Sequence, residues 1–102
     1  MIVIQGWIRL ADGEIERLRA AAETMIRTTR QTEPGCIEYN FAVDLVETNL
    51  LRIGERWKDQ AALDAHFASA HMAAFQKAMA GAKIAGISAM AYTATDERKL
   101  IG

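Results

Sequence analysis

The sequence has few of the residues that form disulfides or interrupt helices and strands, and it has no apolar run long enough to span a membrane. It contains one cysteine and one proline in 102 residues, so no disulfide can form within the chain and packing must stabilise the fold. No apolar run approaches the roughly 20 residues that a membrane span needs. The opening residues, Met1 to Gly6, lack the basic start and the cleavage pattern of a secretion signal. These absences predict a cytoplasmic protein that does not use a membrane as a partner.

The sequence also lacks an excess of charge of either sign. Twelve basic and 13 acidic residues leave a net charge of -1, and no basic stripe is present that would support nucleic-acid binding. Hydrophobic residues make up 51% and charged residues 25%, the ordinary balance of a globular protein. The length fits one domain. We expect a single domain over residues 1–95 and a short C-terminal tail over residues 96–102.

The hydrophobic pattern predicts four strands and two helical regions. Apolar residues alternate with polar ones in the strands and recur at helical spacing in the helices. Asp12 and Asp59 are suitable N-caps for the helices that follow them, and Ser69 or Ala70 marks a possible break in the second helical region. The predicted strands cover 2–9, 36–43, 50–57 and 84–95, and the predicted helical regions cover 14–31 and 60–79.

This order is βαββαβ, which is typical of the ferredoxin-like α+β fold. Both helical layers then cover one face of an antiparallel sheet and leave the other face open. The first strand is apolar on both sides, with Ile4 and Ile8 on one and Val3 and Trp7 on the other. An open apolar face usually marks an interface. We therefore expect a homodimer formed through the sheet face, with twofold symmetry.

Several side chains are candidates for chemistry. His66 lies at the edge of an apolar helical face, and imidazole is the side chain that titrates near neutrality, so it is a candidate base or a half-buried structural residue. Tyr39 and Trp57 have large rings with polar tips, which suits a pocket wall or the core of the sheet. Glu55 alternates with apolar residues and is either a structural anchor or an acid in the pocket. His71 is a candidate for substrate contact or for capping the second helical segment.

A metal site is not expected from the spacing. His66 and His71 are five positions apart, so their rings do not share a face of a continuous helix. No carboxylate lies near them in the sequence at a metal-ligand spacing. The methionines, among them Met72, either line a flexible pocket or fill gaps in the core.

The most specific motifs lie in three segments. Each combines small, aromatic and titratable residues at fixed spacing. They are Glu33-Pro34-Gly35-Cys36-Ile37-Glu38-Tyr39, Glu55-Arg56-Trp57 and His66-Phe67-Ala68-Ser69-Ala70-His71 with Phe75 after it. In these segments and in its element order the chain resembles the antibiotic biosynthesis monooxygenase family. The resemblance implies a dimeric α+β barrel with a pocket between the helices and the sheet of each protomer.

The resemblance also implies an activity. Family members oxygenate phenols, quinols or polycyclic aromatics with molecular oxygen and without a metal or flavin cofactor. An electron-rich phenolate can itself give an electron to oxygen, so the protein need only deprotonate the substrate, orient it and exclude water. The expected catalytic residues are His66, Tyr39 and Trp57, and the expected substrate-binding residues are His71, Phe67, Phe75, Met72 and Glu55.

Other activities of the same fold remain open. One is a small-molecule isomerase that uses histidines of the same helix. Another is a non-catalytic dimer that binds a hydrophobic ligand, like the stress-response barrels, and fold alone does not separate these. Haem degradation is disfavoured, because Gly6 and Gln76 stand where related haem degraders carry asparagine and histidine.

Overall fold

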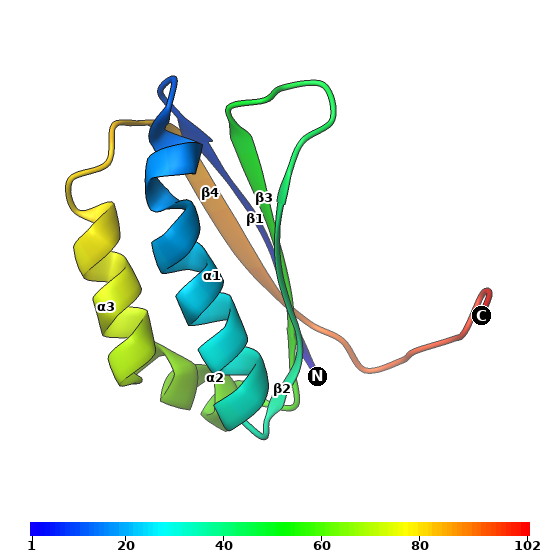
Figure 1. Cartoon of the computed structure of the whole chain (residues 1–102). Coiled ribbons are helices and arrows are strands. Elements are labelled where there is room, and N and C mark those ends of the chain that lie inside the picture. Colours follow the sequence, from blue (N-terminus) through cyan, green and yellow to red (C-terminus); the bar gives the residue numbers. More distant parts are fainter.

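A computed structural model describes all 102 residues, and it confirms the predicted order of elements with the second helical region divided in two. All three helices lie on one face of the sheet (Figure 1). None of them combines the length and the apolar character needed to cross a membrane. The elements are β1 (Ile2–Leu10), α1 (Glu14–Thr32), β2 (Cys36–Val43), β3 (Leu50–Trp57), α2 (Gln60–Phe67), α3 (Ala70–Met79) and β4 (Ile84–Thr93).

The four strands form one antiparallel sheet in the order β2-β3-β1-β4. β1 lies at the centre, where Ile2 faces Trp57 of β3 and Thr93 of β4. α1 connects β1 to β2 across β3, and the α2–α3 segment connects β3 to β4 across β1. This interleaving of two βαβ units confirms the ferredoxin-like fold.

The helix α1 is amphipathic and buries one stripe against the sheet. Its buried residues are Leu18, Met25 and Thr29, at spacings of seven and four, which place them on one side of the helix. The prediction that Asp12 caps this helix is wrong. Gly13 is the N-cap, with a positive φ of 81° and no side-chain cap, and the Asp12 carboxylate instead accepts a hydrogen bond from Asn49.

The second helical region breaks at Ala68 and Ser69. Ser69 has an extended backbone, its hydroxyl accepts a hydrogen bond from the Met72 amide at 3.2 Å, and it donates one to the His66 carbonyl at 2.6 Å. A serine that caps a new helix in this way ends the previous one, because its own backbone leaves the helical region. The break redirects α3 relative to α2 and so changes where His71 points.

The main core lies between β1, β2 and β3 and the helices. Trp57 is fully buried, Tyr39 is 2% exposed, and both pack with Met25 and Phe75 in the same cluster. Gly35 lets the start of β2 approach α2 closely, because a Cβ there would collide with the Ala62 side chain. The large polar-tipped rings therefore lie inside the core, where their polar atoms need partners within the protein.

The face of the sheet without helices is apolar only over β1 and β4. Val3 and Trp7 are half-buried there, and Met90 and Tyr92 beside them are 55% and 51% exposed. Over β2 and β3 the same face carries charge, including Arg56, which pairs with Glu38. The expectation of an apolar open face thus holds for half of the sheet.

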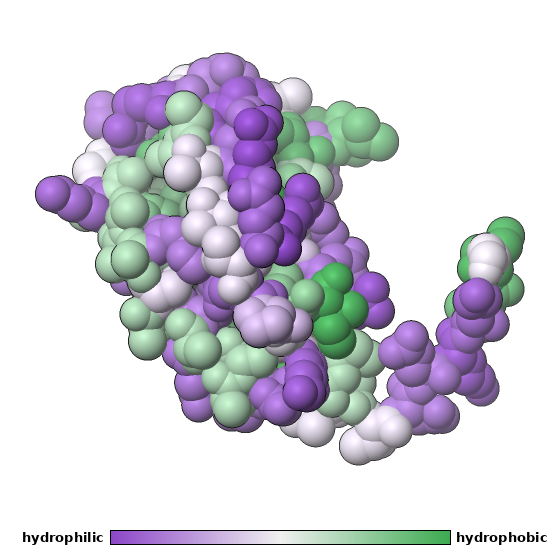
Figure 2. Space-filling view, turned by 60° about the horizontal axis from the view of Figure 1, so that its bottom comes forward, coloured by the Kyte–Doolittle hydropathy of each residue, from purple (hydrophilic) through white to green (hydrophobic).

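The residues after Thr93 form neither helix nor strand. They extend away from the body of the protein, as both overall views show (Figures 1 and 2). Leu100 and Ile101 near the C-terminus are 89% and 93% exposed. The compact part of the chain therefore ends with β4.

Candidate functional site

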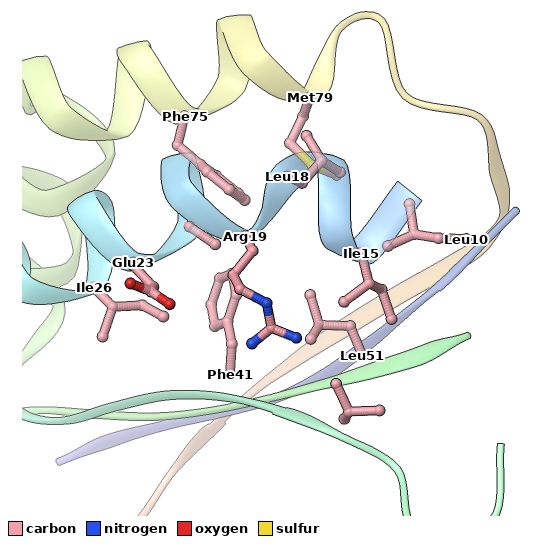
Figure 3. A pocket seen from close by; sticks show the side chains of 12 residues that line it. Leu10, Ile15, Leu18, Arg19, Glu23, Ile26, Phe41, Leu51, Phe75 and Met79 are labelled. Carbon is pink, nitrogen blue, oxygen red and sulfur yellow. The ribbon is translucent and has the colours of Figure 1, made fainter. Parts of the chain in front are cut away.

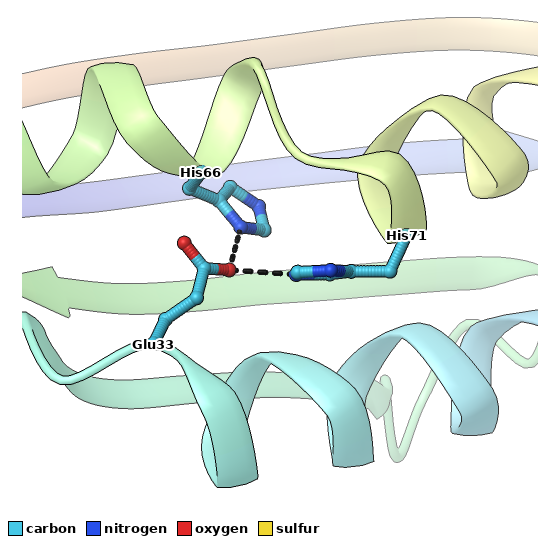
Figure 4. Close-up of side chains that lie close together, drawn as sticks. All are labelled: Glu33, His66 and His71. Carbon is cyan, nitrogen blue, oxygen red and sulfur yellow. Dashed lines mark hydrogen bonds and ion pairs between the residues drawn. The ribbon is translucent and has the colours of Figure 1, made fainter.

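Glu33, His66 and His71 converge where α1 ends and α2 gives way to α3, with Glu33 reaching across from α1 to the two histidines (Figure 4). The Glu33 Oε2 atom lies 2.6 Å from His66 Nδ1 and 2.7 Å from His71 Nε2. His66 is 1% exposed, while the His71 and Glu33 side chains are 15% and 13% exposed. One carboxylate oxygen therefore lies within hydrogen-bond distance of two imidazoles at the edge of the core.

The helix break brings these two histidines together. On a continuous helix, side chains five positions apart diverge, because neighbours on one face are three or four positions apart. Ser69 interrupts the helix between them, so α3 starts in a new direction and presents His71 to the carboxylate that His66 also contacts. The spacing argument against a shared site does not apply to this chain.

Tyr39 extends the cluster into the core. Its hydroxyl lies 3.2 Å from His66 Nε2 and donates a hydrogen bond to Met25 Sδ at 3.0 Å. Burial raises the pKa of Tyr39, and the nearby carboxylates of Glu55 and Glu33 raise it further. Tyr39 is therefore a neutral phenol that fixes the His66 ring, and it does not supply a phenolate.

The buried Trp57 and the half-buried Glu55 form a second hydrogen-bonded pair beside His66. The Trp57 indole donates a hydrogen bond to Glu55 Oε1 at 2.9 Å, and its ring lies 4.7 Å from the His66 ring, centre to centre. Burial raises the pKa of Glu55, and the hydrogen bond from Trp57 offsets part of that rise. The structure shows Glu55 as the hydrogen-bond partner of the Trp57 indole, and its expected role in substrate binding stays a prediction.

An apolar cleft opens between α1, α3 and the β2–β3 side of the sheet (Figure 3). Its volume is about 190 Å³, and its only charged residues are Arg19 and Glu23. An apolar cavity of about 150 Å³ is enough to bind benzene, so this cleft has room for a single substituted ring. Its apolar lining is Leu10, Ile15, Leu18, Ala22, Ile26, Phe41, Val43, Leu51, Phe75 and Met79.

Two phenylalanines separate the cleft from the histidine cluster. Phe41 packs against Tyr39 with ring centres 5.6 Å apart and meets Phe75 edge-on at 5.8 Å. Phe75 also lines a second groove, between α1 and α3, and His71 lies in that groove. Phe75 therefore lies between the apolar cleft and the groove that contains His71.

The remaining predicted residues occupy different environments. Phe75 lines the cleft, Met72 packs against the main core, and Phe67 is 55% exposed with its ring 5.9 Å from that of His66. Phe67 therefore lies outside the cleft in this structure, and its expected role in substrate binding stays a prediction.

Reasoning from the sequence missed Glu33, which contacts both histidines of the candidate site. It stands 33 positions before His66, just after the C-terminal end of α1, and its side chain turns inward to both histidines. The available signal was a carboxylate inside a specific motif directly before Pro34, with no apolar periodicity to explain it. Glu33, His66 and His71 are also the one group of side chains whose ligand atoms, all within 4.8 Å of one another, suit a metal ion.

Comparison with known proteins identifies the family. The family model described as antibiotic biosynthesis monooxygenase matches residues 1–78. The protein YcnE of Bacillus subtilis, provisionally named as a monooxygenase, is 31% identical over 75 residues, covering 74% of this chain and 78% of that protein. The uncharacterised protein sll1783 of Synechocystis is 41% identical over 66 residues, covering 65% of this chain. This alignment spans only 44% of the Synechocystis protein.

Solved structures agree on the fold. A provisionally named antibiotic biosynthesis monooxygenase from Deinococcus radiodurans superimposes with a TM-score of 0.88 at 24% identity, covering 100% of both chains. Rv0793 from Mycobacterium tuberculosis superimposes with a TM-score of 0.83 at 22% identity, covering 96% of this chain and 98% of that one. With the family model covering most of its length, this chain belongs to the antibiotic biosynthesis monooxygenase family.

Proposed function

We propose that the protein is a cofactor-independent monooxygenase that acts on a small phenol or quinol. The observation that carries the proposal is an apolar cleft of single-ring size next to a histidine–carboxylate cluster, since Phe75 lines both the cleft and the groove that contains His71. Membership of the family supports the reaction type. The size of the cleft favours a single-ring substrate over the polycyclic aromatics that the family resemblance also allowed.

The proposed reaction requires only a base, a shaped pocket and oxygen. Removal of the phenolic proton gives a phenolate that reduces molecular oxygen, and a ring carbon then bonds one oxygen atom. That atom becomes a carbonyl and the other leaves as water, with all four electrons supplied by the substrate. The protein contributes the proton acceptor, the orientation of the ring and the exclusion of bulk water.

His66 is the proposed base, and its neighbours hold it in place. Glu33 Oε2 binds one ring nitrogen at 2.6 Å, Tyr39 contacts the other at 3.2 Å, and Trp57 packs on the ring. A substrate in the cleft reaches this cluster when Phe75 turns aside, and His71 is then the more accessible imidazole, with Glu33 linking it to His66. In the proposal His71 and Phe75 contact the substrate, and Tyr39 and Trp57 position the base.

Oxygen uptake tests this function. Purified protein would be incubated with single-ring quinols and phenols and with polycyclic phenols, and consumption would be compared with the spontaneous rate. We expect catalysed uptake with a single-ring substrate and its loss in His66→Ala, while Tyr92→Phe on the opposite face of the sheet stays active. Uptake at the spontaneous rate across the panel, unchanged in His66→Ala, would reject the proposal.

A non-catalytic binding role is the second candidate, and one observation favours it. The walls of the cleft are almost entirely apolar, and Phe41 and Phe75 separate it from every histidine of the chain. A protein that only binds a hydrophobic ligand needs no more than this. Saturable binding of an aromatic ligand that Phe75→Ala alters, with no oxygen uptake for any phenol tested, would select the binding role.

We also propose that two copies of the chain pair through the open face of the sheet. Val3, Trp7, Met90 and Tyr92 form an apolar area on β1 and β4 that no helix covers. A second copy placed on the same area by a twofold axis would bury it.

A further inference from the structure

We propose that Glu33, His66 and His71 form a binding site for a divalent transition-metal ion of the zinc class. Three potential ligands, two imidazoles and one carboxylate, converge from the end of α1, from α2 and from α3 (Figure 4). This donor set suits zinc, and it leaves a further coordination position for water or another ligand. The oxygenation proposed above does not use such a site.

The geometry needs little adjustment to accept the ion. Zinc lies about 2.0–2.2 Å from nitrogen and oxygen ligands, so neighbouring ligand atoms of a tetrahedral site are roughly 3.4 Å apart. Here the carboxylate oxygen is 2.6 Å and 2.7 Å from the two ring nitrogens, and all three atoms lie within 4.8 Å of one another. A retreat of the Glu33 carboxylate by less than about 1 Å opens the required space. Glu33 follows the last residue of its helix, so its side chain can make that movement without moving the sheet.

The contacts of His66 leave one ring nitrogen for a metal ion. The Tyr39 hydroxyl donates a hydrogen bond to Met25 Sδ at 3.0 Å, and its oxygen lies 3.2 Å from His66 Nε2, where it can accept a hydrogen bond from that nitrogen. In a neutral ring with its hydrogen on Nε2, the lone pair of Nδ1 faces the Glu33 oxygen at 2.6 Å. In this tautomer a metal ion between the two atoms would be bound by both.

The Tyr39 contact also fits a common feature of metal-binding histidines. Such a histidine usually donates its other ring N–H to an oxygen, and this bond fixes the tautomer and the direction of the ring. His66 has that partner in Tyr39, and its side chain is buried. In the metal-free form a hydrogen on His66 Nδ1 takes the place of the metal and bonds to Glu33 Oε2 at 2.6 Å.

The metal and the proposed base compete for one atom. A metal on His66 Nδ1 holds the ring to Glu33, so the metal-bound protein would not carry a proton between these groups. Metal binding is therefore measured without substrate, and its outcome is independent of whether the oxygenase proposal holds.

Titration of the metal-free protein with zinc, and with cobalt as a spectroscopic probe, tests the site. Both histidines of the chain lie in it, so imidazole NMR signals report on it alone. We expect one ion per chain, shifts in both histidine ring signals, and visible cobalt absorption. His71→Ala should weaken binding by at least about 100-fold, because even the hydrogen-bond partners of metal ligands are worth about 10- to 100-fold in affinity.

Two further variants make the test decisive. Glu33→Gln replaces the carboxylate by a poor ligand of similar shape and should also weaken binding strongly, while Glu16→Gln, in the exposed first turn of α1, should leave it unchanged. Circular dichroism confirms that each variant is folded. The absence of binding to the wild type, or equal binding to wild type, His71→Ala and Glu33→Gln, would overturn the proposal.

Discussion

The Tyr39 hydroxyl contacts two other side chains in the core. It lies between His66 Nε2 and Met25 Sδ, and both side chains are buried. Tyr39→Phe keeps the ring and leaves the His66 nitrogen without a partner, so we expect the free energy of unfolding to fall by about 1–3 kcal/mol. Urea denaturation measures this change.

Tyr92→Phe is the matched control for that substitution. Tyr92 is 51% exposed on the open face of the sheet, and removal of its hydroxyl should leave stability within about 0.5 kcal/mol of the wild type. If both variants lost the same stability, the hydroxyl of Tyr39 would have no special part in orienting His66.

Glu55 has a carboxyl group whose charge is unfavourable in the folded protein. Burial raises its pKa in the folded state, so the unfolded chain releases this proton at lower pH than the folded one. Its contribution is therefore most favourable below the ordinary carboxyl range and is lost as pH rises through the folded-state pKa. Glu55→Gln stays neutral and can still accept the hydrogen bond from Trp57.

We therefore expect Glu55→Gln to be more stable than the wild type at pH 7, with the advantage disappearing at low pH. Urea midpoints measured across that range test this, and Glu97→Gln in the exposed tail should follow the wild type. A Glu55→Gln variant that is less stable at pH 7 would mean that the carboxylate is stabilised by its surroundings, as an ion-pair partner would be.

The sequence predicts the strand position of a residue better than it predicts the long-range contacts of its side chain. Tyr39 and Trp57 were recognised as sheet residues with polar tips because alternation in a strand reports the face of each residue. Glu33 was missed because its partners lie 33 and 38 positions away. Periodicity describes one element at a time, whereas this contact depends on how three elements meet.

At the scale of elements, the break between α2 and α3 determines the geometry of the site. Ser69→Ala removes the hydroxyl that accepts the hydrogen bond from the Met72 amide, a loss that typically costs about 1 kcal/mol. It also removes the obstacle to one continuous helix, which would turn His71 away from Glu33. We expect lower stability together with a changed His71 NMR signal.

Ser69→Thr is the control, since threonine keeps the capping oxygen and its hydroxyl hydrogen. It should retain the His71 signal and most of the stability. A Ser69→Ala protein with an unchanged His71 signal would show that packing of α3, and not its cap, directs this side chain.

The helix ends show where pattern reasoning succeeds and where it does not. Asp59 accepts a hydrogen bond from the Ala62 amide at 2.9 Å, as predicted for an N-cap. Asp12 does not cap α1, because Gly13 takes the left-handed conformation and shifts the start of the helix by one residue. Two adjacent residues can each begin a helix, and the tertiary contact of Asp12 with Asn49 decides between them.

For the whole molecule, element order was enough to predict the topology. The order βαββαβ with helices on one face leads to the observed sheet because crossovers are right-handed and avoid passing through one another. The cleft could not be predicted, because its walls come from β1, α1, β2, β3 and α3 together. Its volume depends on how closely α1 approaches the sheet, and no sequence pattern specifies that distance.

The proposed dimer depends on one area of this molecule, over β1 and β4 of the open face. Met90 projects from this area and is 55% exposed, next to Gln5 of β1. Met90→Glu would place a charge inside the interface, where an unpaired buried charge costs several kcal/mol. We expect sedimentation equilibrium to give two chains for the wild type and one for Met90→Glu at the same concentration.

Ile87 provides the control on the same strand. It is 62% exposed and points to the opposite face of β4, so Ile87→Glu adds the same charge at a similar exposure but outside the proposed interface. It should remain a dimer. A wild type that sediments as one chain at every concentration would contradict the dimer itself. Dissociation by Ile87→Glu alone would instead locate the contact on the helical side of β4, and the apolar open face would then need another occupant.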